Sequence, residues 1–212
     1  MPDGVSLRAR VAGTAVFVRP ASATGDWVAI IAGGAGDGTI AGVRILSTAE
    51  APVQVGIRLR GQGHALELLQ VDGTTRAGVE LLPDATATLL GSHFAVPGAA
   101  VTLAPGSRLE ATGNVFVHDG PATRGTVAAP PASPAPARGR PARSSPTPIP
   151  PAVPAIAATG DAEVVVRRNV FVGFGPAPVQ GPSTSVLTEP VPAANVVVSA
   201  VPSPTHRPAG DR

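Results

Sequence analysis

The chain has 212 residues, among them 25 glycines, 25 prolines and no cysteine, so disulfides and thiolate metal sites are excluded. Its 16 basic residues are all arginine and face 14 acids, for a formal net charge of only +2. This balance does not favour a nucleic-acid partner, and no apolar run is long enough for a membrane span.

Residues 1–52 predict one or two irregular coils of short strands. Runs rich in Val and Ile between glycines and prolines are typical of strands joined by tight turns, and they occur at Ala15–Arg19, Trp27–Ile31 and Gly42–Leu46. Residues 1–18 lack the continuous apolar core of a signal peptide. The coil-like pattern begins at Asp3 without a capping helix, so we expect a preceding segment or another chain to cover this sheet edge.

The glycine-rich run Gly33–Gly38 has two interpretations. A phosphate-binding loop would need the lysine of a P-loop and the N-terminus of a following helix, and the pattern offers neither. Tight turns between strands are therefore the favoured interpretation.

A repeat with a period of 22 predicts three regular coils over residues 53–125. Val79-Glu80-Leu81 recurs as Val101-Thr102-Leu103, and Ile57-Arg58-Leu59 precedes it by the same step. A fixed period of this size is typical of a parallel β-helix, in which each coil adds short strands to stacked sheets. The phase of residues 65–72 departs from the repeat by about one position.

The repeat also predicts which side chains face inward. Alternation along the strands gives three apolar inward columns, Ala87/Leu109/Val164, Leu89/Ala111/Val166 and Phe94/Phe116/Phe171. The mixed columns that face outward are Thr88/Glu110/Val165 and Leu90/Thr112/Arg167. Ser92, Asn114 and Asn169 occupy one corner, where asparagine side chains bond the turns of neighbouring coils, so a polar ladder is predicted.

Residues 126–158 predict a disordered insert, because this stretch contains ten prolines and no acid. Without it the step from Phe116 to Phe171 falls from 55 to 22, so the insert interrupts the repeat without changing its register. Residues 159–175 then complete one more coil. In the proline-rich tail 176–212 a last strand is expected at residues 195–198, followed by disorder.

The pattern Gly-Val-x-Leu followed by Ala-x-Leu-x-Gly-Asn-x-Phe resembles the right-handed β-helix repeats of bacterial pectate-lyase-like proteins, closest to their carbohydrate-binding and sugar-hydrolase domains. The resemblance covers residues 1–125 and 159–175. It implies an all-β fold, a single-stranded right-handed parallel β-helix, or solenoid, of about five to six coils. Lyases of this fold hold calcium with several carboxylates and use an arginine or lysine as base. No position of this chain matches that motif, so no such role is carried over.

Three histidines fall within coils: His64, His93 and His118. His118 lies three positions further from His93 than one coil would place it, and Asp119 follows directly. Placed together on an outward face, they would suit acid–base chemistry or a metal. The favoured alternative is that they are ordinary surface or turn residues.

A glycosidase needs two carboxylates about 5–10 Å apart. Thr88 stands where Glu110 would need an acidic neighbour, and a one-residue slip would bring Glu67 into that column two rungs away, at about 10 Å. Glu80 is instead expected to form an ion pair with Arg58 across one rung. Two further acids fit turns better, Asp72 and Asp84.

The sequence therefore favours a non-catalytic β-helix module that serves as a structural or interaction surface, within a larger bacterial surface or envelope-associated protein. No catalytic, cofactor-binding or metal-binding residue is assigned, and no cofactor is expected. The alternative is a carbohydrate-binding or polysaccharide-cleaving β-helix domain. A polysaccharide or another protein is the expected partner, and a nucleic-acid binder that uses the arginines of the insert is the least favoured interpretation.

Overall fold

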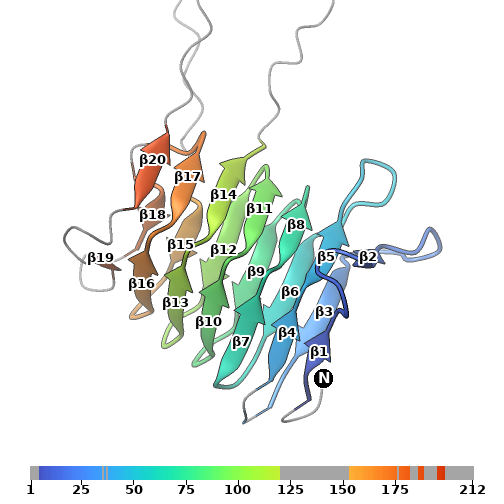
Figure 1. Ribbon diagram of the computed structural model, residues 1–212, viewed down its shortest axis with the longest axis horizontal. Coiled ribbons are helices and arrows are strands. Elements are labelled where there is room, and N and C mark those ends of the chain that lie inside the picture. The colour runs from blue at the N-terminus through green and yellow to red at the C-terminus, as the bar shows by residue number, and fades with distance from the viewer. Residues whose placement is uncertain are drawn as a thin grey trace, which may run out of the picture.

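The computed structural model describes residues 5–119 except 35 and 37, residues 153–181 except 176, and the stretches 186–188 and 195–198. Every regular element in these ranges is a β-strand, and the paired strands run parallel. The chain passes through three sheets in turn, so each strand pairs with the strand three places later (Figure 1). This is a parallel β-solenoid, which confirms the β-helix expected from the repeat.

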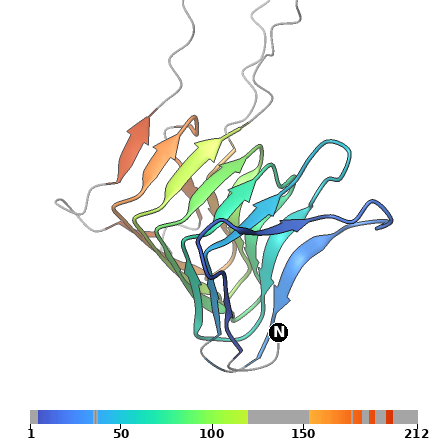
Figure 2. The same ribbon diagram turned by 45° about the vertical axis from the view of Figure 1, so that its right-hand side comes forward.

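The three sheets are the walls around a common interior (Figure 2). Sheet A contains β1 (Leu7–Arg8), β4 (Thr39–Ala41), β7 (His64–Glu67), β10 (Thr86–Leu90), β13 (Arg108–Thr112), β16 (Glu163–Arg167) and β19 (Val186–Thr188). Sheet B contains β2 (Ala15–Val18), β5 (Val43–Leu46), β8 (Gln70–Asp72), β11 (His93–Val96), β14 (Val115–His118), β17 (Val170–Val172) and β20 (Val196–Val198). Sheet C contains β3 (Val28–Ala32), β6 (Val55–Leu59), β9 (Ala77–Leu81), β12 (Ala99–Leu103), β15 (Ile156–Ala158) and β18 (Val179–Gln180).

The coils are long near the N-terminus and become shorter and regular further along the chain. Paired residues of adjacent coils are 33 positions apart in the sequence for Leu7 and Ile40, but 22 positions apart for Phe94 and Phe116. The additional residues lie in corner loops, such as 19–27 ahead of β3. The N-terminal coils are therefore irregular in their loops, while their strands stay in register with the rest of the solenoid.

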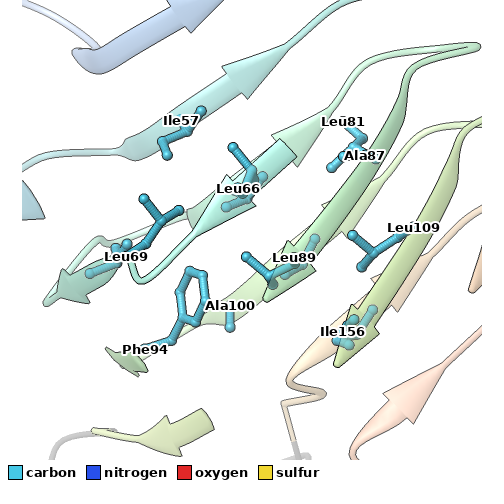
Figure 3. Packing of buried hydrophobic residues seen from close by; sticks show 14 of the residues in the cluster. Ile57, Leu66, Leu69, Leu81, Ala87, Leu89, Phe94, Ala100, Leu109 and Ile156 are labelled. Carbon is cyan, nitrogen blue, oxygen red and sulfur yellow. The ribbon is translucent and has the colours of Figure 1, made fainter. Parts of the chain in front are cut away.

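The interior is one continuous apolar core (Figure 3). Phe94, Phe116 and Phe171 form its aromatic column, with neighbouring ring centroids 5.4 and 5.1 Å apart. All three rings are buried, which confirms the predicted column. The other two predicted inward columns are also buried, and their members are Ala87, Leu109, Val164, Leu89, Ala111 and Val166. Each buried phenylalanine stabilises the fold by about 1.5–3 kcal/mol.

A hydrogen-bonded ladder runs along the corner between sheets A and B, as predicted. The backbone N–H of Ser92 donates to Asn114 Oδ1, and that of Asn114 donates to Asn169 Oδ1, both at 2.9 Å. Asn169 N–H donates to Asn195 Oδ1 at the same distance, which extends the ladder beyond the predicted three residues. The Asn114 amide also donates to the carbonyl of Leu89 at 3.0 Å. Asn114 and Asn169 are fully buried, so the ladder satisfies polar groups that water does not reach.

The insert predicted at 126–158 ends too late in the sequence. Residues 120–152 lie outside the described residues, but Ile156–Ala158 form β15 and pair in register with Val101–Leu103. Ile156 is fully buried, so the boundary at 158 is wrong. Proline is tolerated directly before a strand, and Pro154 makes the start of this strand resemble the insert in composition.

The solenoid also continues further into the tail than predicted. The strand expected at 195–198 is present as β20, which pairs with β17. The sequence does not predict β18 or β19, which lie in the span assigned to the tail and pair with the coil before them. Both are two or three residues long and close to prolines, so no periodic pattern marks them. Residues 199–212 lie outside the described residues.

Candidate functional site

Every acidic side chain on a described strand is paired with an arginine of another coil. The strands carry five acids: Glu67, Asp72, Glu80, Glu110 and Glu163. The closest N–O distances of these ion pairs are 3.5 Å for Arg8–Glu67, 2.9 Å for Arg44–Asp72, 2.6 Å for Arg58–Glu80, 3.2 Å for Arg167–Glu110 and 3.5 Å for Arg108–Glu163. The stacking of rungs about 4.8 Å apart brings these opposite charges within reach of one another. Asp72 thus belongs to β8 and an ion pair rather than to a turn.

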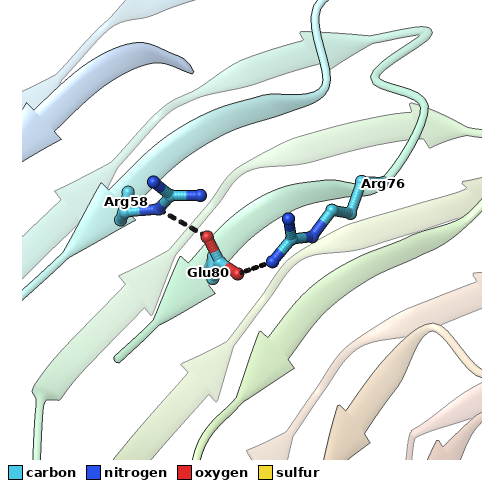
Figure 4. Close-up of polar contacts among 3 residues, drawn as sticks. All are labelled: Arg58, Arg76 and Glu80. Atoms are coloured by element: carbon cyan, nitrogen blue, oxygen red, sulfur yellow. Dashed lines mark hydrogen bonds and ion pairs between the residues drawn. The ribbon is translucent and has the colours of Figure 1, made fainter. Parts of the chain in front are cut away.

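Glu80 is the most enclosed of these carboxylates and lies between two arginines, Arg58 and Arg76 (Figure 4). Its side chain is 11% exposed, and its Oε2 accepts from Arg58 Nε at 2.6 Å. Its Oε1 accepts from Arg76 Nη2 at 2.5 Å. The predicted Arg58–Glu80 pair is confirmed, because the two residues occupy the same outward column of β6 and β9. Arg76 joins them from the turn before β9, which the repeat does not indicate.

His93 and His118 do not share a face of the solenoid. His93 is exposed on sheet B, whereas His118 pairs with Val96, whose side chain is fully buried. Because Val96 lies three positions after His93 on the same strand, the two point to opposite sides. The His118 ring instead lies 5.3 Å from the buried ring of Phe174. The acid–base group of these histidines with Asp119 is therefore excluded.

Glu67 and Glu110 stand in different columns of sheet A. Ala65 pairs with Thr88 in the column of Glu110, while Glu67 pairs with Leu90. The step from Ala65 to Thr88 is one position longer than the repeat. A shorter coil would have been needed to align the two carboxylates, and the proposed catalytic pair is wrong.

His64 belongs to the interior, which sequence reasoning missed. It is 5% exposed and pairs in register with Ala87 of an inward column. Its Nε2 lies 2.9 Å from the carbonyl oxygen of Arg60, so the ring closes the turn that precedes its own strand. The only signal in the sequence for this inward position is the one-residue departure from the repeat near residues 65–72. Its contacts are those of a structural histidine.

A groove with a mixed polar and apolar lining lies on the outward face of sheet A. Its volume is about 300 Å³, and it is lined by Gly63, His64, Thr86, Ala87, Thr88, Arg108 and Glu110. The short threonine side chains leave space beside the longer arginine and glutamate. The Thr86 hydroxyl accepts a hydrogen bond from Gly63 N–H at 2.8 Å. The groove therefore offers hydroxyl, guanidinium and carboxylate groups to a ligand, and none of its lining residues is Phe or Trp.

The outward face of sheet B changes character along the solenoid. Its earlier strands are mixed, because Val16, Val18 and Leu46 are apolar whereas Arg44, Gln70, Asp72 and His93 are polar. Its last three strands present valines, which we call the valine face: Val115, Val117, Val170, Val172, Val196 and Val198. A contiguous apolar surface of this kind is typical of an interaction surface.

The described part of the glycine-rich run after β3 packs closely against the next coil. A Cβ on Gly61 would overlap the carbonyl oxygen of Gly34, so the two corners approach too closely for any larger residue. Ala35 and Asp37 lie outside the described residues.

Comparison of the chain with protein-family models, with curated proteins and with solved structures gave no match. Within the described ranges, no group of three or more histidines and acids is placed to hold a metal ion. The same part of the chain contains no helix that is long and apolar enough to cross a membrane.

Proposed function

We propose that this chain is a non-catalytic β-solenoid module of the pectate-lyase-like type, which provides a structural and interaction surface within a larger bacterial surface or envelope-associated protein. The use of its strand carboxylates carries the proposal, since all five are held by arginines of other coils. A catalytic carboxylate has to reach a substrate and exchange a proton with it. A carboxylate engaged with guanidinium groups of a neighbouring coil joins the coils instead.

The valine face supports the second part of the proposal. The inward neighbours of its valines are Phe116 and Phe171, so the valines themselves add nothing to the core. Solvated strands usually alternate apolar inward and polar outward residues, as β8 does with Gln70 and Asp72 on either side of the buried Val71. Three successive strands that abandon this alternation provide the apolar centre that protein interfaces require.

An activity assay on the full chain tests the non-catalytic assignment. The chain is incubated with a panel of acidic and neutral polysaccharides, and unsaturated and reducing ends are measured. We expect no product above the buffer control for the natural chain or for Glu110→Gln. Product that forms with the natural chain and disappears in Glu110→Gln or His118→Ala would overturn the proposal.

The groove on sheet A favours a second candidate, a sugar-binding module without turnover. Its threonine, arginine and glutamate side chains provide the donors and acceptors that sugar hydroxyls require. A glycan array probed with the full chain distinguishes this candidate from a purely structural module. Signal that is lost in Arg108→Ala but kept in Thr102→Ala, on sheet C, would establish it. An array without signal leaves the structural module.

A further inference from the structure

A pocket on the outward side of sheet C is the feature that no function above uses. It has a volume of about 300 Å³ and is lined by Ile31, Ala32, Gly33, Arg58, Arg60 and Leu82, which we call the sheet C pocket. This volume is at the lower end of the range for small-molecule pockets. The pocket spans three coils, because Ile31 of β3 pairs directly with Arg58 of β6 and Leu82 follows β9 on the next coil.

The walls of the sheet C pocket are largely apolar. Ile31 is 59% exposed, although isoleucine is among the residues most often buried in proteins. Leu82 lies on the next coil, where its backbone N–H donates to the carbonyl of Leu59 at 3.0 Å. An apolar body placed between Ile31 and Leu82 would remove exposed isoleucine from water, which is favourable in proportion to the area covered.

The charge around the sheet C pocket is positive. Glu80 already binds both Arg58 and Arg76, so this group of three carries one excess positive charge. Arg60 adds a second, and no ion pair joins it to a carboxylate among the residues that the structure describes. No acid belongs to the described lining of the pocket. An anionic group is therefore the complement of its rim.

We propose that the sheet C pocket binds a small monocarboxylate with an apolar body. The carboxylate pairs with the Arg60 guanidinium, whose planar donors match the two oxygens of a carboxylate. The apolar body lies against Ile31 and Leu82. One guanidinium without a carboxylate partner suits a single negative charge, whereas Arg58 is engaged with Glu80. The inference is independent of the proposed function, because neither the valine face nor the groove on sheet A takes part.

Sodium octanoate is the probe for a test by methyl NMR on the full chain. The chain has seven isoleucines, and the Ile31 δ1 signal is assigned by its loss in Ile31→Val. We expect octanoate to shift this signal in a saturable manner while the signals of the buried isoleucines stay in place. Sodium acetate lacks the apolar body and 1-octanol lacks the charge, so each should bind at least about tenfold more weakly.

Arginine variants then test the charge pairing. Arg60→Gln should weaken octanoate binding by about tenfold. Arg60→Lys keeps the positive charge but lacks the planar guanidinium, so its affinity should lie between those of Arg60→Gln and the natural chain. Arg168→Gln is the matched control, because Arg168 is likewise exposed but lies at the corner between sheets A and B. It should leave the affinity unchanged. Equal affinity in Arg60→Gln, equal binding of 1-octanol, or no shift of Ile31 would each overturn the proposal.

Discussion

Single residues at the corner between sheets A and B set how one coil passes to the next. The residue before the ladder position adopts a left-handed conformation in several coils, with φ of 58° at Gly91, 66° at Gly113 and 54° at Arg168. Glycine adopts this conformation without steric cost, whereas a residue with a Cβ is strained by about 1–2 kcal/mol. The following residue then directs its side chain into the corner, where it bonds the adjacent coil.

Replacing the strained corner residue should stabilise the fold. Arg168→Gly relieves the strain at an exposed position, and we expect the free energy of unfolding to rise by about 0.5–1 kcal/mol. The reciprocal change Gly113→Ala should lower it by about 1–2 kcal/mol. Denaturant unfolding of both variants measures the two effects. A lower stability of Arg168→Gly would show that its side chain contributes more than its backbone strain costs.

Removing one member of the ladder should destabilise the fold strongly. Asn114→Ala leaves the N–H of Ser92 and the carbonyl of Leu89 without their hydrogen-bond partner in a buried corner. Each buried unsatisfied group costs about 1–3 kcal/mol, so we expect a loss of about 2–4 kcal/mol in thermal or denaturant unfolding. Asn195→Ala, at the half-buried end of the ladder, is the control and should cost less. Similar losses of stability in both variants would mean that the cost of removing a ladder residue does not depend on its burial.

At the scale of elements, the short strands are held in position by pairing with the strands of neighbouring coils. β15 has three residues, and its pairing with β12 and β18 on either side holds it in sheet C. In the preceding coil only Pro97 and Gly98 link β11 to β12, whereas residues 119–155 separate β14 from β15. The scaffold tolerates such a long connection because the entropy of loop closure rises slowly with loop length.

Two deletions of equal length distinguish the connection from the strand that follows it. Deleting 120–152 joins Asp119 to Val153 and leaves a short link before β15, so we expect the unfolding midpoint to stay nearly unchanged. Deleting 126–158 removes a segment of the same length, but takes the buried Ile156 and the rest of β15. We expect it to lower stability by several kcal/mol, since burial of a single isoleucine contributes about 1.5–3 kcal/mol. Circular dichroism melts compare the two, and equal melts would contradict the assignment of β15.

For the molecule as a whole, the strands of each coil pair only with those of the coils on either side of it. The stability of such a stack is approximately the sum of the free energies of the individual coils and of the interfaces between neighbouring coils. Among the described strands, those of the first and last coils pair on one side only. Val197 shows the consequence, because it continues the buried phenylalanine column yet is 43% exposed.

Native-state hydrogen exchange should therefore follow position along the solenoid. We expect the slowest amide exchange in β9 to β13, where every coil is covered on both sides, and faster exchange in β1, β2 and β20. Amides of fully buried residues such as Val79 and Leu109 report the centre, and those of Val196–Val198 report the end. Uniform exchange rates along the chain would indicate a single cooperative unit instead.

Much of the architecture was accessible from the sequence because a solenoid repeats its contacts. The phenylalanine column, the asparagine corner and the Arg58–Glu80 pair all follow from residues that recur at a fixed step. The candidate site was less accessible. Pairings such as Arg108 with Glu163 join coils separated by the insert. The His93–His118 group failed because a shift of three positions along a strand reverses the side of a residue. The Glu67–Glu110 pair failed because one coil is a residue longer than the repeat, which puts the two acids in different outward columns.

The amino-acid sequence by itself determined the period, the inward columns and the polar corner, because packing against an equivalent coil requires similar residues at equivalent positions. Only the tertiary structure decided that His64 faces the interior, where β15, β18 and β19 begin, and that Ile31 meets Arg58 and Arg60 at one pocket. These features depend on the lengths of the corner loops, which set the register between coils. The positions of β15, β18 and β19 also depend on the unpaired edge of the preceding coil. That edge pairs with a short segment whose own sequence does not predict a strand.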